Sequence, residues 1–356
     1  MNALLTGLMA IVGGGAGAPD TPPDTPLSDD AWIRLDQEIE QLAESLHENS
    51  GPEVGLLMRL NYASSSDFTI GGNDLGGILW DNIRLSVAGR TGAFEYFLQT
   101  ESAAASVIIP TGILDAWIRT SINENLRLTM GLMPQPFLNS SGIEPQNLLF
   151  ILRTANAQFW NSRDQSLMLD GTVGAIDWAV SAANGTDFGG DDLAYSGQVS
   201  VHALGGGLDQ VQGAYGKGED LRVTAIASYH ENENAIDEGD VVALELAGSW
   251  GRWYSSLEHL QYGDDGLPGG AGVFSVASDT SPFSAVLSFM FVEDKYETAV
   301  RYQDLDDTFE TEAFTVGVNR YFDGRNGMWQ LNYINKTADL PGIDSQTVAV
   351  GFTVSI

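Results

Sequence analysis

Residues 312–336 read EAFTVGVNRYFDGRNGMWQLNYINK, and this stretch decides the fold. Trp329, Leu331 and Tyr333 alternate with Gln330 and Asn332. A period of two is typical of a strand with one apolar and one polar face. The run 312–322 precedes it, and the turn residues 323–326 between them are rich in Asp, Gly and Asn. The stretch therefore predicts an antiparallel hairpin.

The same period continues through the chain from Val54 to the end. It predicts about sixteen strands of nine to eleven residues each, the length that crosses a bilayer at a tilt. The predicted ranges are 54–63, 78–88, 93–102, 112–121, 125–133, 165–173, 175–184, 193–203, 221–230, 240–249, 252–262, 283–291, 295–303, 312–322, 327–336 and 346–355.

The connections alternate between long and short. Odd-to-even connections such as 64–77, 134–164 and 263–282 are long, whereas even-to-odd ones such as 89–92 are tight. The connection 204–220 is an exception. A single alternating strand fits a soluble β protein equally well, but this asymmetry is typical of outer-membrane barrels. We predict an all-β protein, a transmembrane antiparallel β-barrel spanning 54–356.

Composition excludes several classes of function. The formal net charge is −32, with 16 Lys and Arg against 48 Asp and Glu. Nucleic acid is therefore not an expected partner, because phosphate contacts need clustered basic residues. Cysteine is absent, which excludes disulfides and thiolate metal sites. We expect no cofactor and no metal site, and no enzyme, because the four histidines are scattered and no catalytic motif is present.

The N-terminal residues predict three segments before the barrel. Residues 1–18 resemble a signal peptide, although no Lys or Arg precedes Arg34. Residues 19–27 form a Pro-rich linker, and residues 28–50 form a short helix with heptad spacing. This helix is either a coiled coil that aligns subunits or an amphipathic helix lying on its own domain. The heptad residues are Trp32, Leu35, Ile39, Leu42 and Leu46.

Several motifs resemble the phosphate-selective porin O and P family. They are 113–119 (ILDAWIR), 125–137 (NLRLTMGLMPQPF), 150–153 (FILR), 163–171 (RDQSLMLDG), 182–185 (AANG), 295–302 (KYETAVRY) and 315–319 (TVGVN). The resemblance implies a homotrimer of 16-stranded barrels in which the long connection 134–164 folds inward and narrows the pore. The alternative is an outward surface loop. Two features depart from the family: the chain ends in Ile356 rather than an aromatic residue, and it has three lysines. Phosphate selectivity is therefore not expected.

The charged residues of inward parity are the candidate pore lining, because selectivity depends on charges in the lumen. They either set a transverse field or form paired wall charges with no selective role. The candidates, including two from the connection 134–164, are Arg59, Arg84, Glu95, Glu101, Asp115, Arg119, Arg127, Arg153, Arg163, Glu297 and Arg301.

We predict an outer-membrane porin in a bacterial cell, a water-filled channel for passive diffusion of small hydrophilic solutes or ions. Acidic loop clusters such as Asp264-Asp265 favour a weak cation preference or a general pore. The expected partners are outer-membrane lipid and other copies of the chain. The alternative is a structural barrel that tethers the membrane to peptidoglycan or a partner through residues 19–50.

Overall fold

The computed structural model describes residues 51–70, 73–102, 111–161, 163–185, 193–208, 210–232, 239–263, 279–307, 309–339 and 344–356. The predicted signal peptide, linker and heptad helix lie outside these residues. Among the described residues, no helix is long and apolar enough to cross a membrane.

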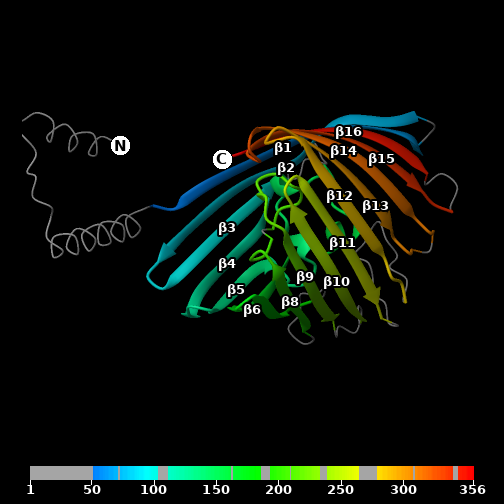
Figure 1. The fold of residues 1–356 in the computed structure, drawn as a ribbon. Helices are drawn as coiled ribbons and strands as arrows, with labels where there is room; N and C mark the ends of the chain where they lie inside the picture. The colour runs from blue at the N-terminus through cyan, green and yellow to red at the C-terminus, as the bar shows by residue number, and fades with distance from the viewer. Residues whose placement is uncertain are drawn as a thin grey trace, which may run out of the picture. The chain divides into compact units, whose positions relative to one another are not determined.

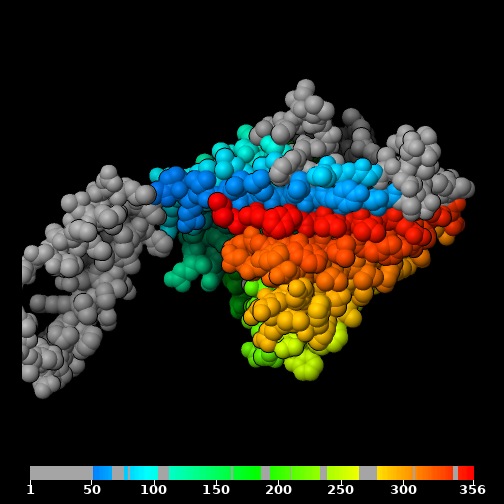
Figure 2. Space-filling model, turned by 90° about the horizontal axis from the view of Figure 1, so that it is seen from above, coloured from blue at the N-terminus to red at the C-terminus, as the bar shows by residue number. Residues whose placement is uncertain are grey.

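Within the described ranges, sixteen strands form one closed antiparallel barrel, which confirms the predicted strand number and the all-β barrel (Figure 1). Each strand pairs with its neighbours in sequence, and β1 pairs with β16 to close the ring. Figure 2 shows this closure, with β1 in blue directly against β16 in red. The strands are β1 (Glu53–Ile70), β2 (Asn73–Thr91), β3 (Phe94–Ser102), β4 (Thr111–Asn123), β5 (Leu126–Pro134), β6 (Arg163–Val173), β7 (Ile176–Ala183), β8 (Ala194–Leu204), β9 (Arg222–Asn232), β10 (Gly239–Trp250), β11 (Trp253–Tyr262), β12 (Phe283–Val292), β13 (Tyr296–Asp304), β14 (Glu312–Asp323), β15 (Gly327–Thr337) and β16 (Ser345–Ser355).

The first hairpin is longer than predicted. The range 64–77 is predicted as a loop, but β1 continues to Ile70 and β2 begins at Asn73. The ladder persists through pairs such as Ser64↔Gly76 and Ser65↔Leu75. Backbone hydrogen bonds require no apolar side chains, so a strand can continue after the apolar alternation stops.

Tight turns join the strands at one end of the barrel, which we call the turn end; the opposite end is the loop end. Gly92, Gly174, Gly251 and Gly324 lie in four of these turns with φ between 55° and 61°. A positive φ is easily adopted by glycine, which is why short hairpin turns contain it.

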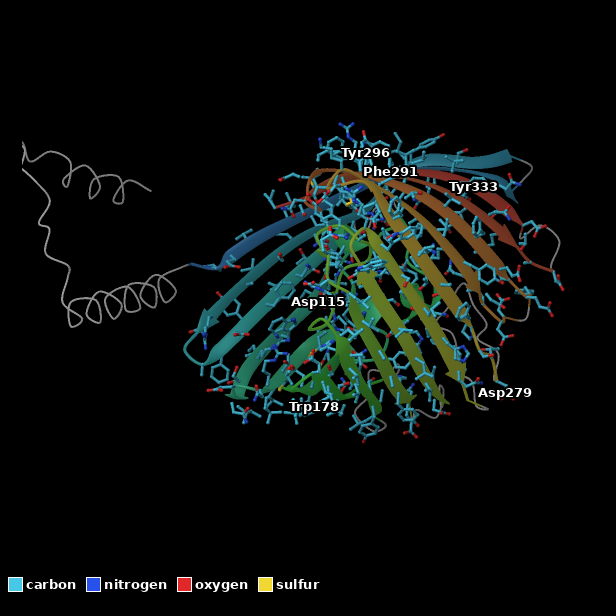
Figure 3. The ribbon with its side chains drawn as sticks, in the orientation of Figure 1. Asp115, Trp178, Asp279, Phe291, Tyr296 and Tyr333 are labelled. Carbon is cyan, nitrogen blue, oxygen red and sulfur yellow. The ribbon has the colours of Figure 1, made fainter. Side chains whose placement is uncertain are left out.

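The outer face of the barrel is apolar and carries exposed aromatic side chains towards both ends. On the loop side these include Tyr195, Tyr229, Tyr302, Phe314 and Tyr333, all at least 36% exposed. On the turn side they include Phe94, Trp250, Trp253, Phe291 and Phe322, all at least 45% exposed. In Figure 3, Phe291 and Tyr296 lie close together at the turn end and Tyr333 lies nearer the loop end; the first two rings are 5.7 Å apart.

Candidate pore and constriction

Residues 135–161 lie inside the barrel, and we call them the inner loop. They contain α3 (Asn139–Gly142), η1 (Pro145–Asn147) and α4 (Ala155–Phe159). Figure 1 shows green connecting segments between the barrel walls. Phe137 and Leu138 pack against Val241, Ala243 and Leu260 of β10 and β11. These apolar contacts attach the first half of the inner loop to one wall.

The tip of the inner loop, residues 148–152, is fixed by side chains from four strands. Arg59 Nη2 donates to the carbonyls of Phe150 and Ile151, and Arg301 Nη1 donates to Leu152 O at 2.7 Å. Side-chain amides meet the rest of the tip backbone. Asn319 Nδ2 donates to Leu149 O at 2.9 Å, Gln330 Nε2 donates to Leu148 O at 3.1 Å, and Ile151 N donates to Asn332 Oδ1 at 2.8 Å. Each carbonyl from Leu148 to Leu152 therefore has a donor, as buried backbone requires.

The side chains of the tip complete a hydrophobic core inside the barrel. Leu149 and Phe150 are 0% and 1% exposed. They pack with Val286, Met290, Ala299, Tyr321 and Met328, which project inward from β12 to β15. This part of the interior is therefore filled with protein rather than water.

Two glutamates hold the flanks of the inner loop. Glu245 and Glu258 are directly paired across β10 and β11. Glu245 accepts bonds from the backbone N–H groups of Asn139, at 2.8 Å, and Ser140, at 3.3 Å. Glu258 accepts from the hydroxyl of Ser140 and, at 3.5 Å, from Asn156 Nδ2. Two carboxyl groups directly opposite each other in a sheet repel when both are charged, and these donors offset that cost.

A second segment enters the barrel from the turn end. Residues 205–221 connect β8 to β9, and we call them the turn-end segment. Its Gln212 N donates to Asn147 O at 3.0 Å, and Ala214 N donates to Glu297 Oε1 at 2.6 Å. The predicted strands on both sides of this connection are close to the observed ones. The connection is therefore as long as the sequence indicates, and it packs into the interior instead of forming a tight turn.

The two connections divide the interior into unequal parts. We call β9 to β16 together with β1 the packed wall, because the inner loop and turn-end segment cover it. We call β2 to β8 the open wall. A cavity of about 460 Å³ lies mainly along the open wall, on the turn side of the inner loop. Its lining includes Arg119, Arg127, Asp170, Asp177 and His202.

Charged side chains of both signs line the open wall. Arg127 Nη2 lies 2.5 Å from Asp170 Oδ2, and Arg163 Nε lies 3.1 Å from Asp115 Oδ1. Arg119 donates to Thr129 at 3.0 Å and lies 4.6 Å from the Trp117 ring centroid. Figure 3 labels Asp115 within the barrel outline.

Arg84 and Arg153 connect the inner loop to its surroundings. Arg84 bonds Glu144 of the inner loop at 2.6 Å and Glu101 of β3 at 3.3 Å. Arg153 Nη1 donates to Ser140 O at 3.1 Å. Burial, together with the nearby positive charge of Arg84, lowers the pKa of Arg153 to about 10, which leaves it charged at neutral pH.

The predicted site residues are distributed over both walls. Arg59, Glu297 and Arg301 are at most 4% exposed and contact the two internal segments, so they do not face open water. The Arg127 side chain is 49% exposed, and Glu95 lies opposite Arg119 in the β3–β4 register. The remaining candidates, Arg84, Glu101, Asp115, Arg119, Arg153 and Arg163, lie along the open wall or in the inner loop beside it.

Sequence reasoning missed Glu245, Glu258, Gln212, Asn319, Gln330 and Asn332, which position the internal segments. Their signal is inward parity in the alternating strands, and for Gln212 it is the length of an exceptional connection. Among the described residues, no group of three or more histidines and carboxylates has a geometry for holding a metal ion.

No protein-family model and no curated protein matches the chain. Solved structures of bacterial porins are similar to it. A triple mutant of the Rhodopseudomonas blastica porin has a TM-score of 0.57 and 12% identity over 86% of this chain and 100% of that one. An anion-selective porin from Comamonas acidovorans has a TM-score of 0.57 and 14% identity over 86% of this chain and 99% of that one. The chain therefore has the fold of 16-stranded bacterial porins.

Proposed function

We propose that the protein is a bacterial outer-membrane channel through which small hydrophilic solutes or ions diffuse passively. The observation that carries this proposal is the closed barrel with opposite surfaces: an apolar outer face bearing aromatic residues near both ends, and a charged cavity inside. Lipid contacts favour the first surface and water favours the second.

The inner loop is the constriction of this channel. Its tip and flanks pack against the packed wall, so the remaining path runs between the loop and the open wall. The open wall carries groups of both signs, including the Arg127–Asp170 and Arg163–Asp115 pairs. Such a path favours polar solutes and gives a weak net charge preference. The acidic excess of the chain favours cations at its mouths.

We further propose a homotrimer that belongs to the phosphate-selective porin O and P family without its phosphate selectivity. The motifs in 113–185 and 295–319 support the family, and the shortage of basic residues argues against phosphate. In this proposal residues 1–18 direct export, and the helix at 28–50 aligns the subunits. Neither segment is part of the described structure.

The test is reconstitution of the purified full chain in a planar lipid bilayer. We expect stable current steps in groups of three and, under a salt gradient, a small reversal potential whose sign indicates cation preference. The control is the same preparation after heat unfolding. A folded barrel that passes no current contradicts the channel. Peptidoglycan binding that is lost on deletion of residues 19–52 then favours the tether.

A further inference from the structure

The turn-end segment is built into the interior rather than lying across its mouth. Gln212, Ala214 and Lys217 are at most 8% exposed. Tyr215 lies on Tyr321 with their ring centroids 4.4 Å apart, and Arg325 Nη2 donates to Gln212 O at 2.5 Å. These contacts come from the strands and the turn of the packed wall.

The turn-end segment meets the tip of the inner loop directly. Gln212 N donates to Asn147 O, and Leu149 N donates to Gln212 Oε1 at 3.3 Å. Ala214 belongs to the same hydrophobic core as Leu149 and Phe150. The constriction is therefore supported from two sides, by the barrel wall and by a segment entering from the turn end.

Glu297 is the polar centre of this contact. Its carboxylate is fully buried and accepts from Ala214 N at 2.6 Å, from the Ser288 hydroxyl at 2.6 Å and from the Tyr321 hydroxyl at 2.6 Å. Three hydrogen bonds therefore fix the position of this buried carboxylate. The bond from Ala214 attaches the turn-end segment to β13.

Gly213 shows how closely these parts approach. Its φ is +94°, and an added Cβ lies 2.8 Å from Glu297 Oε1 and 2.8 Å from Leu149 Cδ2. A side chain at this position collides with both the buried carboxylate and the tip of the inner loop. The contact is therefore specific for glycine.

We propose that the turn-end segment is a pore-sizing element, which closes the packed side of the lumen from the turn end and holds the inner loop tip in place. This inference rests on the proposed channel function. Solutes then pass only along the open wall. Removing the segment exposes Glu297 and Tyr321 to the lumen, frees the tip and opens a second path for water.

The first test replaces residues 206–220 with Asn-Gly, a dipeptide that favours tight hairpin turns. We expect single-channel conductance to rise about two-fold, because pore width limits passage. Larger neutral oligosaccharides should also enter liposomes containing this variant. The folded state is checked by its resistance to unfolding in detergent on gels.

A matched pair of point variants keeps the test decisive if the shortened chain does not fold. Gly213→Ala and Gly216→Ala both place alanine at positive φ, at +94° and +71°, but a Cβ at Gly216 meets no atom within 4 Å. We expect Gly213→Ala to raise conductance and current noise, and Gly216→Ala to match the wild type.

The outcomes separate this inference from the channel proposal. A wild-type chain without conductance overturns the proposed function and, with it, the pore-sizing role. A conducting wild type whose Gly213→Ala and Gly216→Ala variants behave alike overturns the pore-sizing role only.

Because the chain has no cysteine, labelling of a single introduced cysteine gives an independent readout of whether the turn-end segment is buried. Ala214→Cys should react with a polar maleimide far more slowly than Gly216→Cys, and equal rates show that the segment is not seated.

Discussion

The packed wall and the open wall have the same outer surface but different interiors. On both, apolar residues face outward; Leu331 of β15 and Leu167 of β6 are both more than 40% exposed. Inside, Arg59 and Arg301 of the packed wall bond carbonyls of the inner loop, whereas Arg127 of the open wall pairs with Asp170 beside a cavity. Strand alternation decides which side chains point inward. The connections that fold inside decide which of these meet water.

The difference separates two roles of inward charges. On the packed wall a charge is a fixed hydrogen-bonding group, so its removal should mainly reduce stability. On the open wall a half-exposed arginine contributes less stability through its ion pair, and its removal should mainly change ion selectivity. The following predictions test this division.

The largest expected effect is that of Phe150→Ala. Phe150 is 1% exposed, its ring lies 4.6 Å from the Arg301 guanidinium carbon, and it packs in the interior core. Truncating a buried phenylalanine leaves a cavity and should lower the free energy of unfolding by about 3–5 kcal/mol. Denaturant unfolding in detergent, followed by tryptophan fluorescence, measures it.

Met168→Ala is the matched control on the open wall. Met168 lines the cavity and is partly exposed, so truncation should cost less than about 1 kcal/mol, because surface substitutions have small effects. Equal losses in the two variants contradict the division between a packed and an open wall.

The second prediction compares Arg59→Met with Arg127→Met. Loss of Arg59 leaves the carbonyls of Phe150 and Ile151 without their donor, which should cost about 2 kcal/mol. Loss of Arg127, whose side chain is 49% exposed, from its pair with Asp170 should cost less, about 1 kcal/mol. Unfolding midpoints under identical conditions measure both, and a reversed order places Arg59 in open water instead.

The outer half of this architecture follows from the sequence, and much of the inner half does not. The alternation in 312–336 predicts β14 and β15 to within one residue of their observed ends. The interior is harder to predict, because strand alternation places a residue on the inward face but does not show whether water or another part of the protein covers it. Glu297 and Arg127 share inward parity, yet the first is buried against the turn-end segment and the second lines the cavity with a side chain that is 49% exposed.

A sequence signal for the packed wall does exist. Val241, Ala243 and Leu260 occupy inward positions where a water-filled lumen favours polar residues. In the strand 283–292 (FSAVLSFMFV), Val286 and Met290 are also apolar residues at inward positions, and both pack into the core. Apolar inward residues indicate that something covers the wall, but they do not identify the covering segment.

The third prediction concerns ion selectivity. Arg127→Met removes a positive charge beside the cavity, so the ratio of cation to anion permeability should rise. Arg59→Met removes the same charge from a buried position and should change this ratio less. Reversal potentials under a fixed salt gradient measure both variants. A larger shift for Arg59→Met shows that ions pass along the packed wall.

The smallest expected effect is that of Glu144→Gln. Glu144 is the inner loop carboxylate that bonds Arg84 of the open wall at 2.6 Å, and its side chain is 36% exposed. Its neutralisation leaves the Arg84 charge less balanced, so the reversal potential should shift slightly towards anions. The shift should be visible at 0.1 M salt and largely lost at 1 M, because the screening length falls from about 10 Å to about 3 Å.

Glu293→Gln is the control variant. Glu293 pairs with Arg252, its side chain is 65% exposed, and it is not among the residues that line the cavity. An equal shift for both variants assigns the effect to the overall charge of the protein, and a shift that persists at 1 M assigns it to a movement of the inner loop.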